Sequence, residues 1–193
     1  MVRKKSLLGC AVLFSCFSLF GQDKEKHWIG LETDPISTVF GARTLSAVIE
    51  PPKIKHWSLF LNVVNADFPN WMDDFLNPKN KGKDFESEIN IGGGFAIDYF
   101  IKEEREGTYF GLINLFFQNE ISRNATSQII LTHNIIPRLG FRWFPFQKNN
   151  LYINPFLGLR YEYSLEKIQF VDGQEYLPAG IQPFGTVHVG YHF

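Results

Sequence analysis

Residues 85–99 read FESEINIGGGFAIDY, and this stretch decides the fold class. In a β-strand successive side chains point to opposite faces, so every second residue shares a face. One face is mostly apolar and carries Phe85, Ser87, Ile89, Ile91, Gly93, Phe95, Ile97 and Tyr99. The other face is polar and acidic and carries Glu86, Glu88, Asn90 and Asp98 between small residues. A helix would mix the two sets, so the alternation predicts a strand that is apolar on one side.

The same alternation recurs along the chain. The eight candidate strands are residues 28–33, 45–49, 57–63, 85–99, 108–120, 129–143, 151–163 and 181–193. In 108–120 the contrast is weak, and we assign Tyr109, Ile113, Leu115 and Phe117 to the apolar face. The glycines at 92–94 lack the Lys-Ser/Thr of a phosphate loop, so we expect curvature or close packing there.

Strand length and number indicate a closed barrel. Several candidates run about 12–16 residues, whereas strands of globular proteins usually have about 5–6. A tilted strand crosses a bilayer with about 9–11 residues, and a sheet in lipid must close to pair its backbone. Eight strands close around an interior filled by side chains. We therefore predict an all-β, eight-stranded antiparallel up-and-down transmembrane β-barrel.

Residues 1–21 have the layout of a signal peptide. Arg3, Lys4 and Lys5 precede an uncharged stretch from Leu7 to Phe20, and a charged run follows Gly21. The apolar stretch is short for a membrane-spanning helix, although a signal anchor is the alternative. We expect cleavage after Gly21 and a barrel domain over residues 22–193. Both cysteines precede residue 21, which excludes disulfides and thiol chemistry from the mature chain.

Charge and composition exclude other classes. The 193 residues carry a formal net charge of −1, so no basic excess is available to bind nucleic acid. Hydrophobic residues make up 45% of the chain, which excludes a disordered protein.

The connections predict an orientation. Residues 50–55, 101–107 and 145–150 are compact turns, whereas 67–84, 122–127 and 165–179 lie on the other side with 38–42. Bacterial barrels have short periplasmic turns and longer outer loops, so the C-terminus is expected at the periplasmic rim.

The C-terminus carries a family resemblance. Residues 187–193 read VHVGYHF, with alternate apolar positions at Val187, Val189, Tyr191 and Phe193. This pattern resembles the insertion signal of Gram-negative outer-membrane barrels, which the barrel-assembly machinery recognises. The chain from His27 onward is similar to the small eight-stranded class that includes OmpA-type and OmpX-type barrels. The resemblance implies an outer-membrane location, lipid contact and assembly by that machinery, and it implies no activity.

Charged residues gather on the polar faces of the strands. The predicted lumen set comprises Glu86, Glu88, Asp98, Arg138, Arg142, Arg160 and Glu162, together with Glu32 and Glu120. In a narrow barrel such charges must be paired, because desolvating a lone charge is costly. We expect an internal ion-pair network that fills the lumen, and a polar pore or small binding site is the alternative.

The loop 67–84 has an apolar helical pattern. Trp71, Met72, Phe75 and Leu76 would align on one or two helical turns. Exposed apolar groups on a loop favour a surface or protein partner or the membrane surface, and the alternative is a lid packed over the barrel mouth.

No catalytic, cofactor or metal pattern stands out. His188 and His192 are too far apart on one strand for a zinc ion. His133 with Ser127 and Glu120 is a possible constellation for a lipid-modifying enzyme. We expect a non-enzymatic structural or interaction role through the outer loops. The alternatives are a narrow porin-like conduit, a lipid-modifying barrel enzyme and a secreted lipocalin-like carrier.

Overall fold

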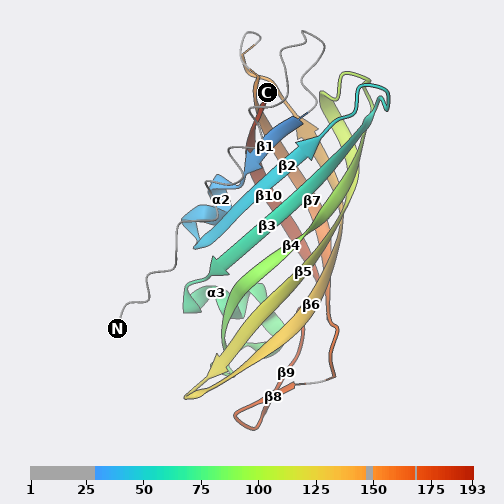
Figure 1. Cartoon of the computed structure of the whole chain (residues 1–193). Coiled ribbons are helices and arrows are strands. Elements are labelled where there is room, and N and C mark those ends of the chain that lie inside the picture. The colour runs from blue at the N-terminus through green and yellow to red at the C-terminus, as the bar shows by residue number, and fades with distance from the viewer. Residues whose placement is uncertain (1–28, 147–149, 168) are drawn as a thin grey trace.

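The chain folds into one closed antiparallel barrel of eight strands (Figure 1). The computed structural model describes residues 29–146, 150–167 and 169–193, and the predicted signal peptide lies outside them. The barrel strands are β1 (Ile29–Thr33), β2 (Ala42–Ile49), β3 (Trp57–Asp67), β4 (Glu86–Phe100), β5 (Gly107–Arg123), β6 (Thr126–Arg142), β7 (Leu151–Ser164) and β10 (Gly180–His192). Each pairs with its neighbours in the chain, and β1 pairs with β10 to close the ring. The predicted all-β, eight-stranded antiparallel barrel is confirmed.

The connections differ between the two ends of the barrel. The end that carries the C-terminus and the short connections after β2, β4 and β6 is called the turn end (Figure 1). The opposite, loop end carries α2 (Pro35–Val39), α3 (Asn70–Leu76), the 3-10 helix η2 (Pro78–Asn80) and a small hairpin of β8 (Gln169–Val171) and β9 (Gln174–Tyr176). The short helices and this hairpin lie in segments predicted as loops. Among the described residues, no helix is both long enough and apolar enough to span a bilayer.

At the turn end the buried Arg105 links the connection after β4 to the connection after β2. The Arg105 guanidinium donates hydrogen bonds to the carbonyl oxygens of Pro51, Ile54 and Trp57 at 2.6–2.9 Å. Lys55 from the same turn forms an ion pair with Glu103, and this contact raises the pKa of Lys55. These bonds tie the connection after β4 to the connection after β2.

Strand β5 shows its predicted faces reversed. Tyr109, Ile113 and Phe117 are buried inside the barrel, whereas Phe110, Leu112 and Phe116 are exposed outside. Both faces of β5 are apolar, so alternation alone cannot orient the strand. Pairing decides it, because Ile113 stands opposite Ala96 and Ile136, which are both buried. The assignment of the apolar face of residues 108–120 was therefore wrong.

A bulge in β4 reverses the faces of its first residues. Ile89 pairs with Asn119 of β5 and Ile91 pairs with Gln118, so Asn90 is an extra residue. The Asn65 side chain of β3 donates to the carbonyl oxygens of Ile89 and Asn90 at 2.9 and 2.8 Å. An inserted residue shifts the period-two pattern by one position. Residues before the bulge consequently point to the face opposite the one predicted.

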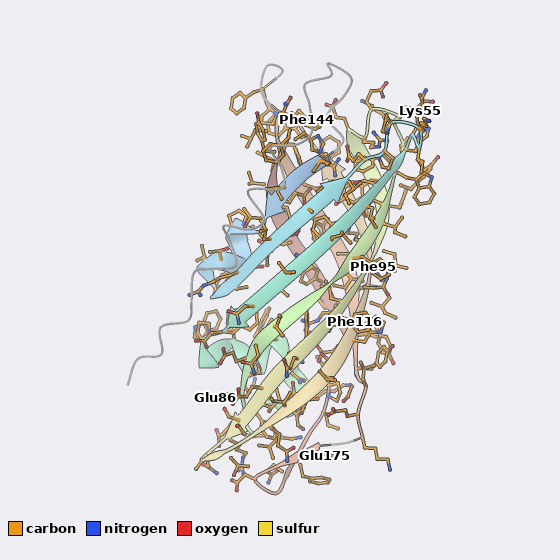
Figure 2. The ribbon with its side chains drawn as sticks, in the orientation of Figure 1. Lys55, Glu86, Phe95, Phe116, Phe144 and Glu175 are labelled. Carbon is orange, nitrogen blue, oxygen red and sulfur yellow. The ribbon has the colours of Figure 1, made fainter. Side chains whose placement is uncertain are left out.

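The outer wall is apolar around the barrel, as the side chains in Figure 2 illustrate for Phe95 and Phe116. Exposed apolar residues occur on β3 to β7 and on β10: Leu61, Val63, Phe95, Ile97, Phe110, Leu112, Phe116, Leu139, Leu157, Leu159 and Ile181. The interior combines buried charges with an apolar cluster that includes Val48, Phe60, Phe100, Ile113 and Phe156. Charges inside and apolar groups outside is the reverse of a soluble domain.

Candidate functional site

The lumen contains a bidentate ion pair between β4 and β6. Arg138 Nε and Nη2 donate to the two carboxylate oxygens of Asp98 at 3.0 and 2.7 Å. Both side chains are buried, with exposed side-chain fractions of 0% and 2%. A paired geometry of this kind offsets much of the cost of removing both charges from water.

A second pair crosses the barrel. The Arg142 guanidinium of β6 donates to Glu50, which directly follows β2, and lies 3.8 Å from Glu32 Oε1 of β1. In the ring of eight strands β2 and β6 stand opposite each other. This contact joins opposite walls, so side chains bridge the lumen at this level.

Two histidines extend the network toward the carboxylates. His188 Nδ1 lies 2.9 Å from Glu32 Oε2, and His188 Nε2 lies 3.9 Å from Asp34 Oδ2. His192 Nε2 lies 3.8 Å from Glu50 Oε2. The network therefore contains four carboxylates, two guanidiniums and two imidazoles.

Aromatic rings enclose both guanidiniums. The Arg138 guanidinium carbon lies 4.5 Å from the Phe156 ring centre and 5.3 Å from those of Phe60 and Tyr109. The corresponding distances from Arg142 to Phe100 and Tyr152 are 4.6 and 4.8 Å. Cation–π contacts strengthen when they are desolvated, so the rings and charges together form a packed interior. Chemically, this arrangement fills the lumen at this level with paired charges and aromatic rings.

The predicted lumen residues separate into three groups. Asp98, Arg138 and Arg142 lie together in this network. Arg160 and Glu162 also face inward but contact the loop segments described below. Glu86 and Glu88 precede the bulge and pair with Ser122 and Glu120 on the outward face, so the assignment of Glu86, Glu88 and Glu120 to the lumen was wrong.

Sequence reasoning missed Glu50 and the two enclosing tyrosines. Glu50 lies in a segment predicted as a turn, yet it continues the inward series Ser46, Val48 by one step. The continued alternation of inward residues was therefore the sequence feature that could have identified Glu50. Tyr109 was assigned to the apolar face and Tyr152 to neither face, although both side chains are buried beside charged groups.

The predicted lid lies in the mouth of the barrel at the loop end. Arg160 and Gln182 both donate to the Leu76 carbonyl oxygen at the end of α3, at 3.3 and 2.6 Å. Glu162 accepts from the backbone of Ala179 at 3.2 Å. Met72 is buried and Leu76 half-buried, whereas Trp71 and Phe75 are 66% and 74% exposed. The helix thus packs over the mouth with one face and presents two aromatic rings on another.

Asn80 joins this helical segment to the segment between β9 and β10. Its buried amide accepts from Leu177 N at 3.1 Å and donates to Leu177 O at 2.9 Å. Asn77 donates to the same carbonyl at 2.8 Å. These bonds join the segment 70–80 to the segment 177–179, and the two together are called the cover of the barrel mouth.

We expect Asn80→Ala to loosen this cover. The substitution leaves the Leu177 amide hydrogen without its acceptor, at a cost of about 1–3 kcal/mol. Hydrogen exchange at Leu177 should accelerate by about tenfold or more. The exposed Lys81→Ala is the matched control and should leave the rate unchanged. Equal exchange in both variants would mean that the cover is held elsewhere.

The possible catalytic constellation is not assembled. His133 faces outward, with Nδ1 2.6 Å from the Tyr163 hydroxyl and its ring stacked on Phe116 at 4.3 Å. Ser127 lies six residues away on the same strand, which places it at about 20 Å. Glu120 stands opposite Ile129 and accepts from Asn90. The grouping of His133 with Ser127 and Glu120 was therefore wrong. Within the described ranges no cluster of His, Cys, Asp and Glu could hold a metal ion.

The C-terminal pattern lies on the outer wall. Val187, Val189, Tyr191 and Phe193 alternate with His188 and His192, which point into the lumen. The Tyr191 and Phe193 rings contact edge to face at 5.3 Å.

Comparison with known proteins gives one structural likeness. No known protein family matches the chain, and no curated protein matches it. A solved structure of a major outer membrane protein from Thermus thermophilus is similar, with 15% sequence identity and a TM-score of 0.43. The match covers 86% of this chain and 100% of that chain.

Proposed function

We propose that this protein is an integral β-barrel of a Gram-negative outer membrane, exported by residues 1–21. It has a non-enzymatic structural or interaction role through its loop end. The observation that carries the proposal is the apolar outer wall around a charged and closed lumen. Water-soluble monomers rarely present so large an apolar surface, whereas a closed barrel in lipid requires one.

The distribution of charge argues against a soluble carrier. A lipocalin-like barrel holds an apolar ligand inside, so its inward residues would be apolar and its outer wall polar. Here Asp98, Arg138 and Arg142 point inward, and Leu112 and Leu157 point outward.

The network also argues against a porin-like conduit. The contact between Arg142 and Glu50 joins opposite strands, and the aromatic rings stack against both guanidiniums. The interior of an eight-stranded barrel is about filled by its own side chains, so no continuous aqueous path is expected through this network.

The loop end offers an exposed aromatic surface. The Trp71 ring of α3 contacts Phe40, which follows α2, with ring centres 6.3 Å apart. Phe75 lies one helical turn from Trp71 and is exposed. Aromatic residues are enriched at protein interfaces, so this surface is suited to a protein or surface partner.

The proposal is tested by fractionation and heat-modifiability. The full chain is expressed in a Gram-negative host, and gel mobility of the outer-membrane fraction is compared before and after boiling. We expect the protein in that fraction, with a compact form that shifts on boiling. Recovery as a soluble protein in the periplasm or medium would overturn the membrane assignment.

A further inference from the structure

Arg160 of β7 points into the barrel mouth without a carboxylate partner. Arg138 and Arg142 are each paired with a carboxylate, whereas Arg160 forms no ion pair with any described residue. Glu162 lies on the same face of β7, but its carboxylate accepts from Ala179 N instead. The Arg160 Nε atom is buried and has no hydrogen-bond partner within the described ranges. A partly buried guanidinium without a counterion favours a bound anion.

A neutral oxygen occupies the position where a counterion to Arg160 would lie. Arg160 Nη2 and Gln182 Nε2 donate to the Leu76 carbonyl oxygen at 3.3 and 2.6 Å, and Arg160 Nη2 also donates to Gln182 Oε1. Arg160 and Gln182 are a cross-strand pair of β7 and β10, so their donors converge on one point. Leu76 is the last residue of α3, and the terminal carbonyls of a helix carry a partial negative charge. The end of the helix thus stands in for an anion.

Two lysines near η2 add positive charge at the mouth. Lys83 Nζ donates to the Asn80 side-chain oxygen at 3.3 Å and to the Glu175 carbonyl oxygen at 2.9 Å, and both acceptors are neutral. A Cβ atom at Gly180 would lie 2.6 Å from Lys79 Nζ, so this ammonium group lies over the start of β10. Neither lysine forms an ion pair with a residue that the structure describes. The mouth therefore has positive charge that no described carboxylate pairs with.

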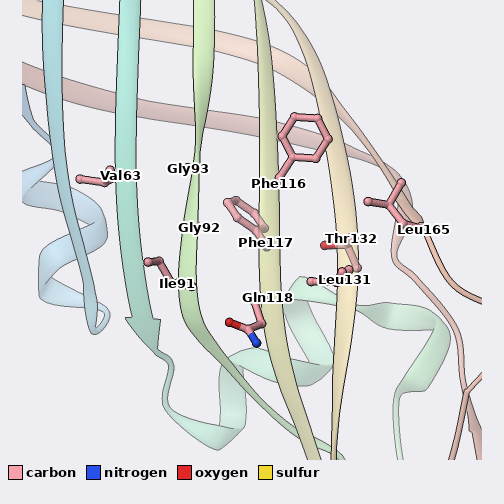
Figure 3. Close-up of a pocket in the computed structure, with 10 residues that line it drawn as sticks. All are labelled: Val63, Ile91, Gly92, Gly93, Phe116, Phe117, Gln118, Leu131, Thr132 and Leu165. Atoms are coloured by element: carbon pink, nitrogen blue, oxygen red, sulfur yellow. The ribbon is translucent and has the colours of Figure 1, made fainter.

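The segment that carries Leu76 lies inside the mouth. It bonds to β7 and β10, and in Figure 3 the short helices are visible behind β4 to β6. The groove that the labelled residues of Figure 3 line is on the outer side of this wall, and its lining contains no charged residue. The groups that could hold an anion are therefore in the mouth and not on the outer wall.

We propose that Arg160 and Gln182 form a binding site for a carboxylate group, which α3 covers with its terminal carbonyl in this structure. A carboxylate displaces the Leu76 carbonyl oxygen because it balances the guanidinium charge and accepts two hydrogen bonds, whereas the carbonyl is neutral. A monoanion is favoured over a dianion such as phosphate, since Glu162 on the same face repels a second negative charge. This inference rests on the interaction role proposed for the loop end, and it gives that role a ligand class.

The test measures binding of benzoate to the full-length protein in detergent by isothermal titration calorimetry, with benzamide as the neutral isostere. We expect wild type to bind benzoate and not benzamide. Arg160→Gln should lower the affinity for benzoate by about tenfold or more, because a hydrogen bond to a charged group is lost. Arg43→Gln removes the same charge from an exposed position of β2 and should leave the affinity unchanged. Gln182→Met removes the second donor and should weaken binding even if Arg160→Gln fails to fold.

Loosening the cover should have the opposite effect. The Leu76 carbonyl oxygen competes with the ligand, so a larger fraction of molecules with an open site raises the apparent affinity. Asn80→Ala should therefore strengthen benzoate binding by about tenfold, which a merely structural role of Arg160 would not produce.

Four results would overturn the site or its ligand. Absence of benzoate binding in both wild type and Asn80→Ala, or an unchanged affinity in Arg160→Gln, would overturn the site. Equal binding of benzamide, or tighter binding of inorganic phosphate, would overturn the carboxylate assignment. Heat-modifiability of wild type in the outer-membrane fraction is scored first. A barrel that assembles there but binds no benzoate would therefore overturn this inference and leave the proposed location standing.

Discussion

Asp98→Ala is expected to lower the free energy of unfolding by about 3–5 kcal/mol, because it leaves the buried Arg138 guanidinium without a counterion. The Arg138 side chain is buried, and the rings of Phe60, Tyr109 and Phe156 lie against its guanidinium. The measurement is urea-induced unfolding of the protein in lipid vesicles, followed by loss of the compact gel form.

Matched variants distinguish loss of the buried ion pair between Asp98 and Arg138 from the general effect of removing a charge. Asp172→Asn removes the charge of a partly exposed ion pair with Arg123 and should cost less than about 1 kcal/mol. The double variant Asp98→Leu with Arg138→Met removes both charges and should recover most of the stability, because well-packed apolar residues can replace a buried ion pair. If Asp98→Ala unfolds at the wild-type urea concentration, the lumen is hydrated and the closed-interior interpretation fails.

Alternation predicted the strands whose two faces differ in polarity. In β6, Leu131, Leu139 and Phe141 face outward and Arg138 and Arg142 face inward, as the sequence pattern indicates. The inward and outward faces of β6 therefore follow from its sequence alternation alone, and they agree with the pairing in the barrel. The ring of eight strands followed in turn from strand number and length, together with the requirement that a sheet in lipid must close.

The same reasoning failed where local pattern carries no information. In β5, Ile113 and Leu112 are equally apolar, so only pairing with β4 and β6 distinguishes inside from outside. At Asn90 a single extra residue reverses the faces, and period-two alternation has no means of locating it. The error at Glu86 and Glu88 follows directly from that bulge.

The sequence predicted that an ion-pair network fills the lumen, but it identified only some of the residues in that network. Carboxylates and guanidiniums on inward faces must be paired, which identified Asp98 and Arg138 as members. Which charged groups pair with one another depends on the strand order and shear of the closed barrel. These bring Glu50 to Arg142 although the two residues are 92 positions apart in the chain. No spacing rule links two residues so far apart in the chain.

The second large effect is expected at the middle of the apolar outer wall. Outward apolar residues of β4 run from Ile91 to Tyr99, so Phe95 lies near the centre of the band. Phe95→Arg should destabilise the barrel in lipid by about 2–4 kcal/mol, because a charge at the bilayer midplane cannot reach water. Urea unfolding from vesicles measures the loss.

Depth dependence makes this prediction specific to a membrane. Alternation alone would place Ile91 near mid-bilayer, but Ile91 adjoins the Asn90 bulge and the polar Gln118 near the loop end of the band. Ile91→Arg should therefore cost less than Phe95→Arg, since the penalty falls to about 0–1 kcal/mol near the interface. Glu86→Arg lies beyond the band at an exposed position and should cost less than Phe95→Arg. A soluble barrel would show no such gradient, because an arginine on a hydrated wall costs little wherever it stands. Equal stability of the Phe95→Arg and Glu86→Arg variants would thus contradict contact between the outer wall and lipid. The apolar surface would then have to be covered by another partner.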